Sequence, residues 1–358
     1  MTEFDVIAHY FSQNFPKRTD VILGIGDDAA LCSVPNGMQL AVSIDTLVEG
    51  VHFPVTTSPE DIGYKALAVN LSDMAAMGAT PAWMTLALTC PKVNETWLKR
   101  FSQGLLELAQ SAQVSLIGGD TTQGPLTITL QISGFVPIGQ ALRRDLAQPG
   151  DGIYVTGTLG DAGLGLALIQ ETEKISPKER ETPRCGPPLV VERLVSLSNH
   201  VETWEGDRVR AFWEEDRERA LKFVKSRLNR PTPQLKIGQA LRGIASSAID
   251  ISDGLVADLG HILKASSVGA TLQLENLPLS NVLHDYLSLE QAWYFALSAG
   301  DDYELCFTVP PNKEKALQEA LETEIYTRIG TIETESGLRC LDEKGQTFVP
   351  KRPGYQHF

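Results

Sequence analysis

Predicted strands and helices alternate along this chain, and that alternation restricts it to the mixed α/β folds. Short apolar runs typical of strands lie at 39–44, 83–89, 114–119 and 127–136. Segments with helical periodicity separate them, at 59–78 and 94–112. In the second of these segments, one apolar stripe that includes Leu98, Phe101 and Leu105 follows Asn94, which we expect to cap the helix.

A break rich in proline and glycine, AQPGDG at 147–152, divides this pattern into two halves. We therefore expect a mixed α/β (α+β) protein with an N-terminal domain at 1–148 and a C-terminal domain at 149–358. Strands predicted at 153–157 and 301–309, and a strand that opens a helix at 248–267, belong to the second domain. A charged insert at about 171–230 interrupts it. Opposite charges four residues apart in its second half predict a solvated helix with little core, rather than a dedicated binding element.

Composition excludes several classes of protein. The chain has 358 residues, 42% of them hydrophobic, which is enough to bury the cores of two domains. A net charge of −14 argues against a nucleic-acid surface. No run reaches the roughly 18 apolar residues of a membrane span, and the first residues lack the order of a secretory signal, so we expect a cytoplasmic protein with no membrane partner. Five cysteines are scattered singly and are expected to be reduced thiols.

Acidic residues recur at the ends of the predicted strands. The run VILGIGDDAAL, residues 21–31, places Asp27 and Asp28 between glycines in a segment apolar enough for a buried strand. The same order of strand, acid and small residue recurs at 43–50, 70–78, 118–124, 249–255 and 299–305. Each motif alone is typical of a tight turn or a helix N-cap. Six together favour a shared cleft, in which the carboxylates repel one another unless a cation lies among them.

The ligand types indicate which cation this is. Asp and Ser oxygens without Cys or His clusters suit Mg²⁺ or Ca²⁺. Because Mg²⁺ takes one or two carboxylates and fills its other positions with water and phosphates, so many acids predict several ions and a nucleoside triphosphate. Helix openings expected at Ser72–Asp73 and Ser252–Asp253 would direct backbone N–H groups at the same anion. The chain has no P-loop and no kinase catalytic loop, which disfavours the common kinase folds.

Seven motifs occur in a distinctive order: GIGDDAA, SIDTLVEGVHF, YKALAVNLSDMAAMGATPAW, IGGDTT, YVTGTLGDAGLGL, IDISDGLVADLGHI and GDDYELCFTV. In this order they closely resemble the thiamine-monophosphate kinase family of the aminoimidazole-ribonucleotide-synthetase superfamily. The resemblance covers nearly the whole chain, with the charged insert as the main gap. It implies a dimer-forming N-terminal α/β domain, a C-terminal α/β domain and an ATP cleft between them. It also implies ATP-dependent phosphorylation of thiamine monophosphate to thiamine diphosphate.

The resemblance also implies roles for single residues. Metal ligands fall on Asp28, Ser43, Asp45, Asp73, Asp120, Asp250 and Asp253, with the carbonyl of Ile44. ATP contacts fall on Gly119, Asp120, Arg144 and Ser252, and substrate contacts on His52, Asp301 and Tyr355. Catalytic roles fall on Asp45, Asp73 and Asp120, and Asp27 is expected to support Asp28. Two positions depart from the family pattern: Asp301 replaces the usual Glu, and Ser102 stands where members often carry an aromatic residue.

This reaction needs positioning and charge neutralisation more than a covalent intermediate. The acceptor phosphate oxygen is already ionised at neutral pH, so we expect direct in-line transfer, with no strong base and no phosphoenzyme. Several Mg²⁺ ions would offset the repulsion between the two anions. The resemblance further implies a homodimer.

Other interpretations stay open at this point. Without the resemblance, His52 is equally typical of a turn histidine, Arg144 of a surface charge and Tyr355 of a residue packed on its domain. A selenophosphate synthetase would carry a reactive Cys before the acidic motif, whereas Cys32 follows it. A hydrogenase-maturation dehydratase would end in a reactive Cys, and this chain ends in Phe358. A nucleotide-sensing module would tolerate loss of metal ligands.

Overall fold

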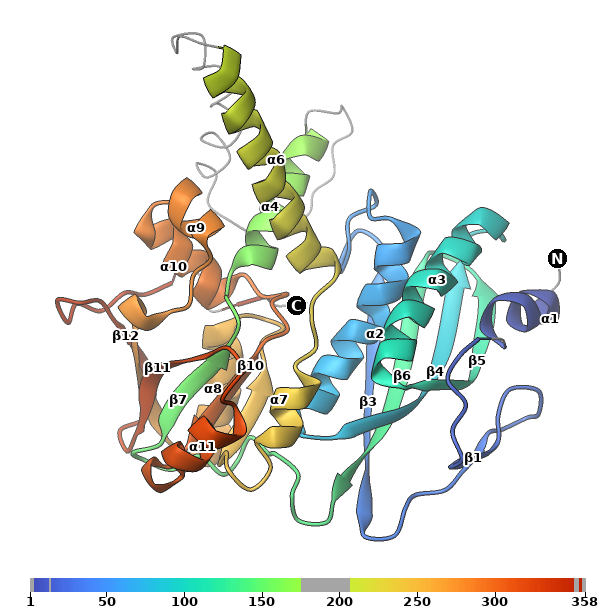
Figure 1. The fold of residues 1–358 in the computed structure, drawn as a ribbon, viewed down its shortest axis with the longest axis horizontal. Helices are drawn as coiled ribbons and strands as arrows, with labels where there is room; N and C mark the ends of the chain where they lie inside the picture. The colour runs from blue at the N-terminus through green and yellow to red at the C-terminus, as the bar shows by residue number, and fades with distance from the viewer. Residues whose placement is uncertain (1–2, 13, 175–206, 351–353, 356–358) are drawn as a thin grey trace. The chain divides into compact units, whose positions relative to one another are not determined.

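The computed structural model describes residues 3–12, 14–174, 207–350 and 354–355 of the chain. They belong to two compact units, which are described separately (Figure 1). The first comprises residues 1–143, 232–250 and 313–324, and the second comprises 144–231, 251–312 and 325–358. Segments distant in the sequence therefore contribute to each unit.

A four-stranded sheet of order β3-β6-β4-β5 forms the centre of the first unit. Its strands are β3 (Met38–Val48), β4 (Thr80–Cys90), β5 (Ser115–Gln123) and β6 (Thr127–Pro137). β6 pairs antiparallel with β3 and β4, and β5 pairs parallel with β4. All four correspond to the apolar runs predicted as strands, so these predictions are confirmed.

Helix α2 (Pro59–Ala76) packs on one face of this sheet, and α3 (Glu95–Ala112) packs beside α2 (Figure 1). The Asn94 side chain accepts a hydrogen bond from the Trp97 N–H, as predicted for an N-cap. The buried stripe of α3 includes Leu98, Phe101, Leu105 and Leu108. The remaining elements of this unit are α1 (Glu3–Val6), η1 (Ile7–Phe11), β1 (Val21–Leu23), β2 (Leu31–Cys32), α7 (Leu235–Ala240), β8 (Ser247–Asp250) and α11 (Glu314–Ala320).

The larger sheet has six strands in the order β12-β9-β11-β7-β10-β8. The strands not yet named are β7 (Gly152–Thr156), β9 (Gly269–Gln273), β10 (Leu305–Val309), β11 (Tyr326–Glu333) and β12 (Gly337–Leu341). β7 pairs antiparallel with β10 and β11, whereas β12 pairs parallel with β9. The helical elements of the second half are α4 (Asp161–Lys174), α6 (Asp207–Asn229), α8 (Leu255–Ser266), η3 (Leu274–Asn276), α9 (Asn281–Tyr286), α10 (Leu289–Ser298) and η4 (Pro311–Lys313).

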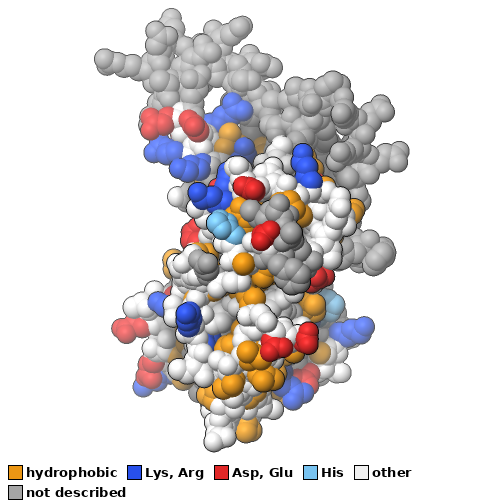
Figure 2. Space-filling model, turned by 90° about the vertical axis from the view of Figure 1, so that its right-hand side faces the viewer, with side chains coloured by type: hydrophobic (Ala, Val, Ile, Leu, Met, Phe, Trp, Pro, Cys, Tyr) orange, Lys and Arg blue, Asp and Glu red, His pale blue; other side chains and the backbone are white. Residues whose placement is uncertain are grey.

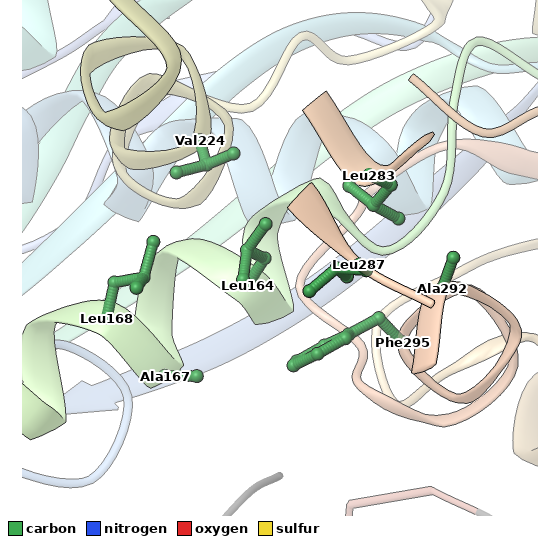
Figure 3. Close-up of a cluster of buried hydrophobic side chains, with 8 residues drawn as sticks. All are labelled: Leu164, Ala167, Leu168, Val224, Leu283, Leu287, Ala292 and Phe295. Carbon is green, nitrogen blue, oxygen red and sulfur yellow. The ribbon is translucent and has the colours of Figure 1, made fainter. Parts of the chain in front are cut away.

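The charged insert is less detached from the core than the sequence indicates. Its second half forms α6, which packs along α4. Val224 of α6 is fully buried in a cluster with Leu164 of α4 and Phe295 of α10 (Figure 3). Leu228 is buried in a neighbouring cluster. The expectation of a solvated helix with little core is therefore wrong for the C-terminal part of α6, while residues 175–206 lie outside the described residues.

The segment at 21–31 also differs from the prediction. β1 and β2 form a short two-stranded sheet, in which Ile22 is 67% exposed and Leu31 is 56% exposed. Asp27 and Asp28 are exposed as well, so this segment is not a buried strand. Among the described helices, none combines the length and hydrophobicity that crossing a membrane requires.

Candidate active site

Three aspartates come together in the first unit beside the C-terminal half of α2. Side chains alternate along β3, so Ser43 and Asp45 face α2. The Ser43 hydroxyl donates a hydrogen bond to the carboxylate of Asp73 on α2. The preceding residue, Ser72, donates to the carboxylate of Asp250 at the end of β8, with an O–O distance of 2.9 Å. Strand β3, helix α2 and strand β8 thus each contribute one carboxylate.

The surroundings of Asp45 disfavour the charged form of its carboxyl group. Burial raises the pKa of its carboxyl group to about 7, and the negative charges of Asp73 and Asp250 act in the same direction. Its Oδ2 atom is buried and has no hydrogen-bond partner among the described residues. A buried carboxylate with acidic neighbours is stable only when it binds a proton or lies beside a cation.

The donor chemistry of this cluster fits Mg²⁺. Carboxylate and hydroxyl oxygens are its preferred protein ligands, and the unpartnered Oδ2 of Asp45 is an acceptor available to an ion. In the described part of the chain, no three His, Cys, Asp or Glu side chains are already arranged as a metal-binding cluster.

Asp120 lies on the other face of the same sheet, whereas Gly119 lies on the face of Asp45, with which it is in register through β4 and β6. Asp120 of β5 is in register with Ala87 of β4, which pairs with Thr129 of β6 and through it with Thr46 of β3. Residues in register share a face, so Asp120 lies with Thr46 and opposite to Asp45. The side chain of Ile44 is also on this outer face and is 60% exposed. Asp45 and Asp120 are inside their strands, and the expectation that they occur at strand ends is wrong.

The second unit brings together four further candidates: Ser252, Asp253, Asp301 and Tyr355. The Asp301 N–H donates to the Ser252 carbonyl at 2.8 Å, and the Tyr355 N–H donates to the Asp253 carbonyl at 3.0 Å. Ser252, predicted to contact ATP, and Asp301, predicted to contact thiamine monophosphate, are thus neighbours through a backbone hydrogen bond.

The two predicted helix openings are not anion sites. Ser72 and Asp73 lie inside α2, near its C-terminal end, so their N–H groups belong to the helix. Ser252 and Asp253 do precede α8, but their N–H groups donate to the Asp258 carboxylate, at 3.0 Å each. The Asp258 side chain takes the place that we expected for a phosphate.

Three further candidates, Asp28, Arg144 and His52, have contacts of a different kind. Asp28 is exposed, and its N–H donates to the Asp27 carboxylate at 2.8 Å. Arg144 is exposed at the start of the second unit. His52 accepts a hydrogen bond at Nδ1 from the Val48 N–H at 3.0 Å, which is the turn contact considered as its alternative. A contact between His52 and a phosphate would therefore use Nε2.

The matches to known proteins cover most of the chain. Residues 26–136 match the N-terminal domain of AIR synthase related proteins, and residues 148–342 match the C-terminal domain. The thiamine-monophosphate kinase of Escherichia coli strain K12 is 46% identical over 358 residues, covering 99% of this chain and 98% of the relative. The chain belongs to the thiamine-monophosphate kinase family.

Solved structures of thiamine-monophosphate kinases agree with this relationship. The crystal structure of the Stenotrophomonas maltophilia K279a kinase superposes with a TM-score of 0.75 and 42% identity, covering 93% of each chain. A structure of AaThiL complexed with AMPPCP and TMP superposes with a TM-score of 0.69 and 28% identity, covering 91% of this chain and 89% of that one. The predicted mixed α/β fold and the family resemblance are both confirmed.

Two residues beside the site of this thiamine-monophosphate kinase family member were not predicted in their observed roles. Ser72 orients Asp250 by its hydroxyl, and Asp258 closes the turn at 252–254. The sequence contained a signal for Asp258, because an acid four residues after Gly254 is typical of a helix start. It contained none for Ser72, whose partner is 178 positions away.

Proposed function

We propose that this chain transfers the γ-phosphoryl group of ATP to the phosphate of thiamine monophosphate, giving thiamine diphosphate and ADP. The observation that carries the proposal is the convergence of Asp45, Asp73 and Asp250 in the first unit. A reaction between two phosphate anions needs bound cations, and this cluster has the negative charge to bind them. The names of the relatives, and the TMP and AMPPCP in one neighbouring structure, support the same reaction.

The transfer is proposed to be direct and in line. A bond forms between a phosphate oxygen of thiamine monophosphate and the γ-phosphorus, and the bond from that phosphorus to the β-phosphate oxygen breaks, its electron pair remaining on ADP. The attacking oxygen is ionised at neutral pH, so no side chain has to remove a proton. The contribution of Ser43 and Ser72 is to orient Asp73 and Asp250 through hydrogen bonds.

Several Mg²⁺ ions are proposed as cofactors. The residues proposed to hold them are Asp28, Ser43, Ile44 through its carbonyl, Asp45, Asp73, Asp120, Asp250 and Asp253. When bound, such ions neutralise charge on the phosphates and fix their orientation. The buried, unpartnered Oδ2 of Asp45 supports this proposal.

Substrate contacts are proposed by family resemblance, with support from their placement. Gly119, Asp120, Arg144 and Ser252 are proposed to contact ATP, and His52, Asp301 and Tyr355 to contact thiamine monophosphate. The backbone bond between Asp301 and Ser252 supports a common location for part of the two substrates. Because Asp is one methylene group shorter than the usual Glu, the Asp301 carboxylate is expected to lie at a different distance from thiamine monophosphate than a Glu carboxylate would.

A coupled assay tests the proposed function. Purified protein with Mg²⁺, ATP and thiamine monophosphate is expected to form thiamine diphosphate and ADP in equal amounts, measured by chromatography. Omission of Mg²⁺ with a chelator present is expected to abolish product. ATP binding without any thiamine diphosphate would instead favour a nucleotide-sensing module.

A cytoplasmic homodimer is also proposed. The outer side of edge strand β3 exposes a row of alternating apolar side chains, with Leu40 at 48%, Val42 at 54% and Ile44 at 60% exposure. Figure 2 shows that hydrophobic side chains also group on the surface that is on the right in Figure 1. A second copy that covers the row would remove it from water, and Asp120 shares this face. Cysteines 32, 90, 306 and 340 are free thiols, which supports a reducing compartment.

A charge on the outer side of β3 is expected to dissociate the dimer. Sedimentation of the unmodified protein should give twice the mass of one chain, and Val42→Asp should shift it toward one chain, because association would bury the new carboxylate. Ile325→Asp, at a residue that is 74% exposed outside β3, is the matched control and should remain dimeric. A monomeric unmodified protein would contradict the dimer.

A further inference from the structure

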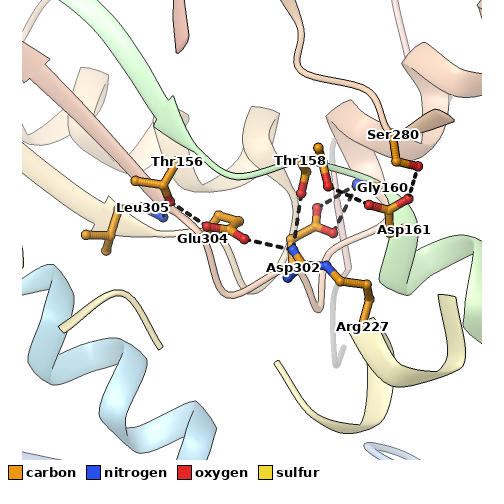
Figure 4. A network of polar contacts seen from close by, with 9 residues as sticks. All are labelled: Thr156, Thr158, Gly160, Asp161, Arg227, Ser280, Asp302, Glu304 and Leu305. Atoms are coloured by element: carbon orange, nitrogen blue, oxygen red, sulfur yellow. Dashed lines mark hydrogen bonds and ion pairs between the residues drawn. The ribbon is translucent and has the colours of Figure 1, made fainter. Parts of the chain in front are cut away.

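A buried polar network lies in the second unit, next to the loop that carries Asp301. Arg227, near the end of α6, donates to the Glu304 carboxylate at 2.8 Å and to the Thr158 carbonyl at 3.3 Å (Figure 4). Glu304 is 2% exposed and also accepts from the Thr156 hydroxyl at 2.6 Å. Asp302, equally buried, accepts from the Gly160 N–H at 3.0 Å. Three segments of the second unit therefore meet at this network.

The loop anchored by the network has an unfavourable backbone conformation. Asp301 has φ +62° and Tyr303 has φ +50°, in the left-handed region that residues other than glycine rarely adopt. Each such residue typically costs about 1 kcal/mol or more, so the surrounding contacts must hold the loop in place. The two residues that alternate with them, Asp302 and Glu304, are the buried anchors. Asp301 thus lies in a strained loop, and the next residue, Asp302, is held by its hydrogen bond to the Gly160 N–H.

The electrostatics of the network depend on Arg227. Burial and the neighbouring acids raise the pKa of Asp302 well above its usual range, despite the Gly160 hydrogen bond and the charge of Arg227. The pKa of Arg227 is raised, because the attraction of Glu304, Asp302 and Asp161 exceeds the opposing effect of burial. Close packing adds to this, since a Cβ at Gly157 would lie 2.3 Å from the Glu304 Oε1. Arg227 is therefore the counter-charge that keeps the Glu304 carboxylate in this position.

We propose that Arg227 is a positioning residue for the kinase reaction, which holds the 300–304 loop so that Asp301 meets thiamine monophosphate. The proposal rests on the proposed substrate contact of Asp301. It gives the C-terminal end of α6, within the charged insert, a role in acceptor binding. Arg227 acts through Glu304 and the strained loop, without touching either substrate.

Arg227 reaches the turn proposed to contact ATP only indirectly, through the loop whose Asp301 N–H donates to the Ser252 carbonyl. The turn that carries Ser252 is held by the Asp258 carboxylate, which accepts from the N–H groups of residues 252, 253 and 254 at 3.0–3.1 Å. Among the described residues, Arg227 bonds to Thr158 and Glu304 and not to that turn. Loss of Arg227 should therefore affect the contact with thiamine monophosphate more than the contact with ATP.

The test measures KM for both substrates in three variants of the network and one control variant. Arg227→Met is expected to raise KM for thiamine monophosphate about tenfold or more, with a smaller change for ATP, because a buried charged hydrogen bond is lost. Arg227→Lys keeps the charge and should restore part of the affinity. Arg227→Met with Glu304→Gln removes both charges, so it should recover stability while the raised KM persists. Arg219→Met, at an exposed arginine of the same helix, is the control and should behave like the unmodified enzyme.

Hydrogen exchange gives a readout that does not depend on activity. The Asp301 and Tyr303 amides bond to the Ser252 and Ile251 carbonyls at 2.8 Å, so they should exchange faster in Arg227→Met. The amides of 252–254 should stay protected. A fall in thermal stability with both KM values and the loop's exchange unchanged would overturn the positioning role. Absence of thiamine diphosphate from the unmodified enzyme would overturn the proposed function, and the exchange of the loop would still decide the role of Arg227.

Discussion

Replacement of Asp73 by Asn is expected to lower kcat by about 10³-fold, since loss of a ligand that stabilises phosphoryl-group charge removes several kcal/mol of transition-state stabilisation. Asp73 is a charged neighbour of Asp45 in the cluster, and it accepts a hydrogen bond from Ser43. Asn has nearly the same shape and retains an acceptor for Ser43, so the fold should be preserved. Turnover at saturating ATP and thiamine monophosphate, over a range of Mg²⁺ concentrations, measures the effect.

Asp61→Asn is the matched control for this prediction. Asp61 lies in the first turn of the same helix, α2, and belongs to no proposed site. It should retain the kcat of the unmodified enzyme, and both variants should have the circular dichroism spectrum of the folded protein. Full turnover of Asp73→Asn at limiting Mg²⁺ would show that Asp73 does not bind the ion.

The periodic segments were the part of the fold that sequence predicted well. The stripe of α3 and the apolar runs of the four-stranded sheet depend on contacts that repeat every few residues, and local periodicity records them. The segment at 301–309 was only half right, because the strand begins at Leu305. Residues 301–304 form a loop in which Asp301 and Tyr303 have positive φ, and its Glu304 is paired with a distant residue, Arg227, that no local pattern shows.

Face and register were harder to predict than the elements themselves. Asp45 and Asp120 both follow apolar residues in similar motifs, yet the register of β3, β6, β4 and β5 places them on opposite faces. A shift of one residue reverses the face of a strand residue, and motif recognition does not contain that information. The face on which Asp120 lies therefore follows only from the pairing of the four strands.

In the charged insert, composition alone hid a buried face of a helix. Its composition of both charge signs is typical of a solvated segment, and that interpretation holds for the exposed positions of α6 such as Lys222 and Lys225. Val224 and Leu228, four residues apart, supply a narrow apolar stripe that suffices to bury one side of the helix. Arg227 lies beside that stripe, and its burial follows from pairing with Glu304 at a separation of 77 residues.

Asp45→Asn is expected to stabilise the metal-free protein above pH 7 while removing activity. The folded pKa of Asp45, about 7, lies above its ordinary value of 3.8. The contribution of Asp45 to the stability of the folded state is therefore fully present below about pH 4 and is lost as the pH rises through 7, because the buried carboxylate must ionise beside two others. Asn cannot ionise, and its amide can donate to Asp73. At pH 8 the free energy of unfolding of Asp45→Asn is expected to exceed that of the unmodified protein by on the order of 2 kcal/mol, or about 5 °C in Tm.

Thermal unfolding at pH 4 and pH 8, with chelator or with Mg²⁺, distinguishes the causes. With chelator, the variant should exceed the unmodified protein at pH 8 and match it at pH 4. Mg²⁺ should raise the Tm of the unmodified protein at pH 8 and raise that of Asp45→Asn much less, because the variant lacks the charge that attracts the ion. A lower Tm of Asp45→Asn at pH 8 with chelator would mean that the Asp45 carboxylate supports the fold itself. The charge at this position would then be structural, and the argument that the cluster is arranged for a cation would fail.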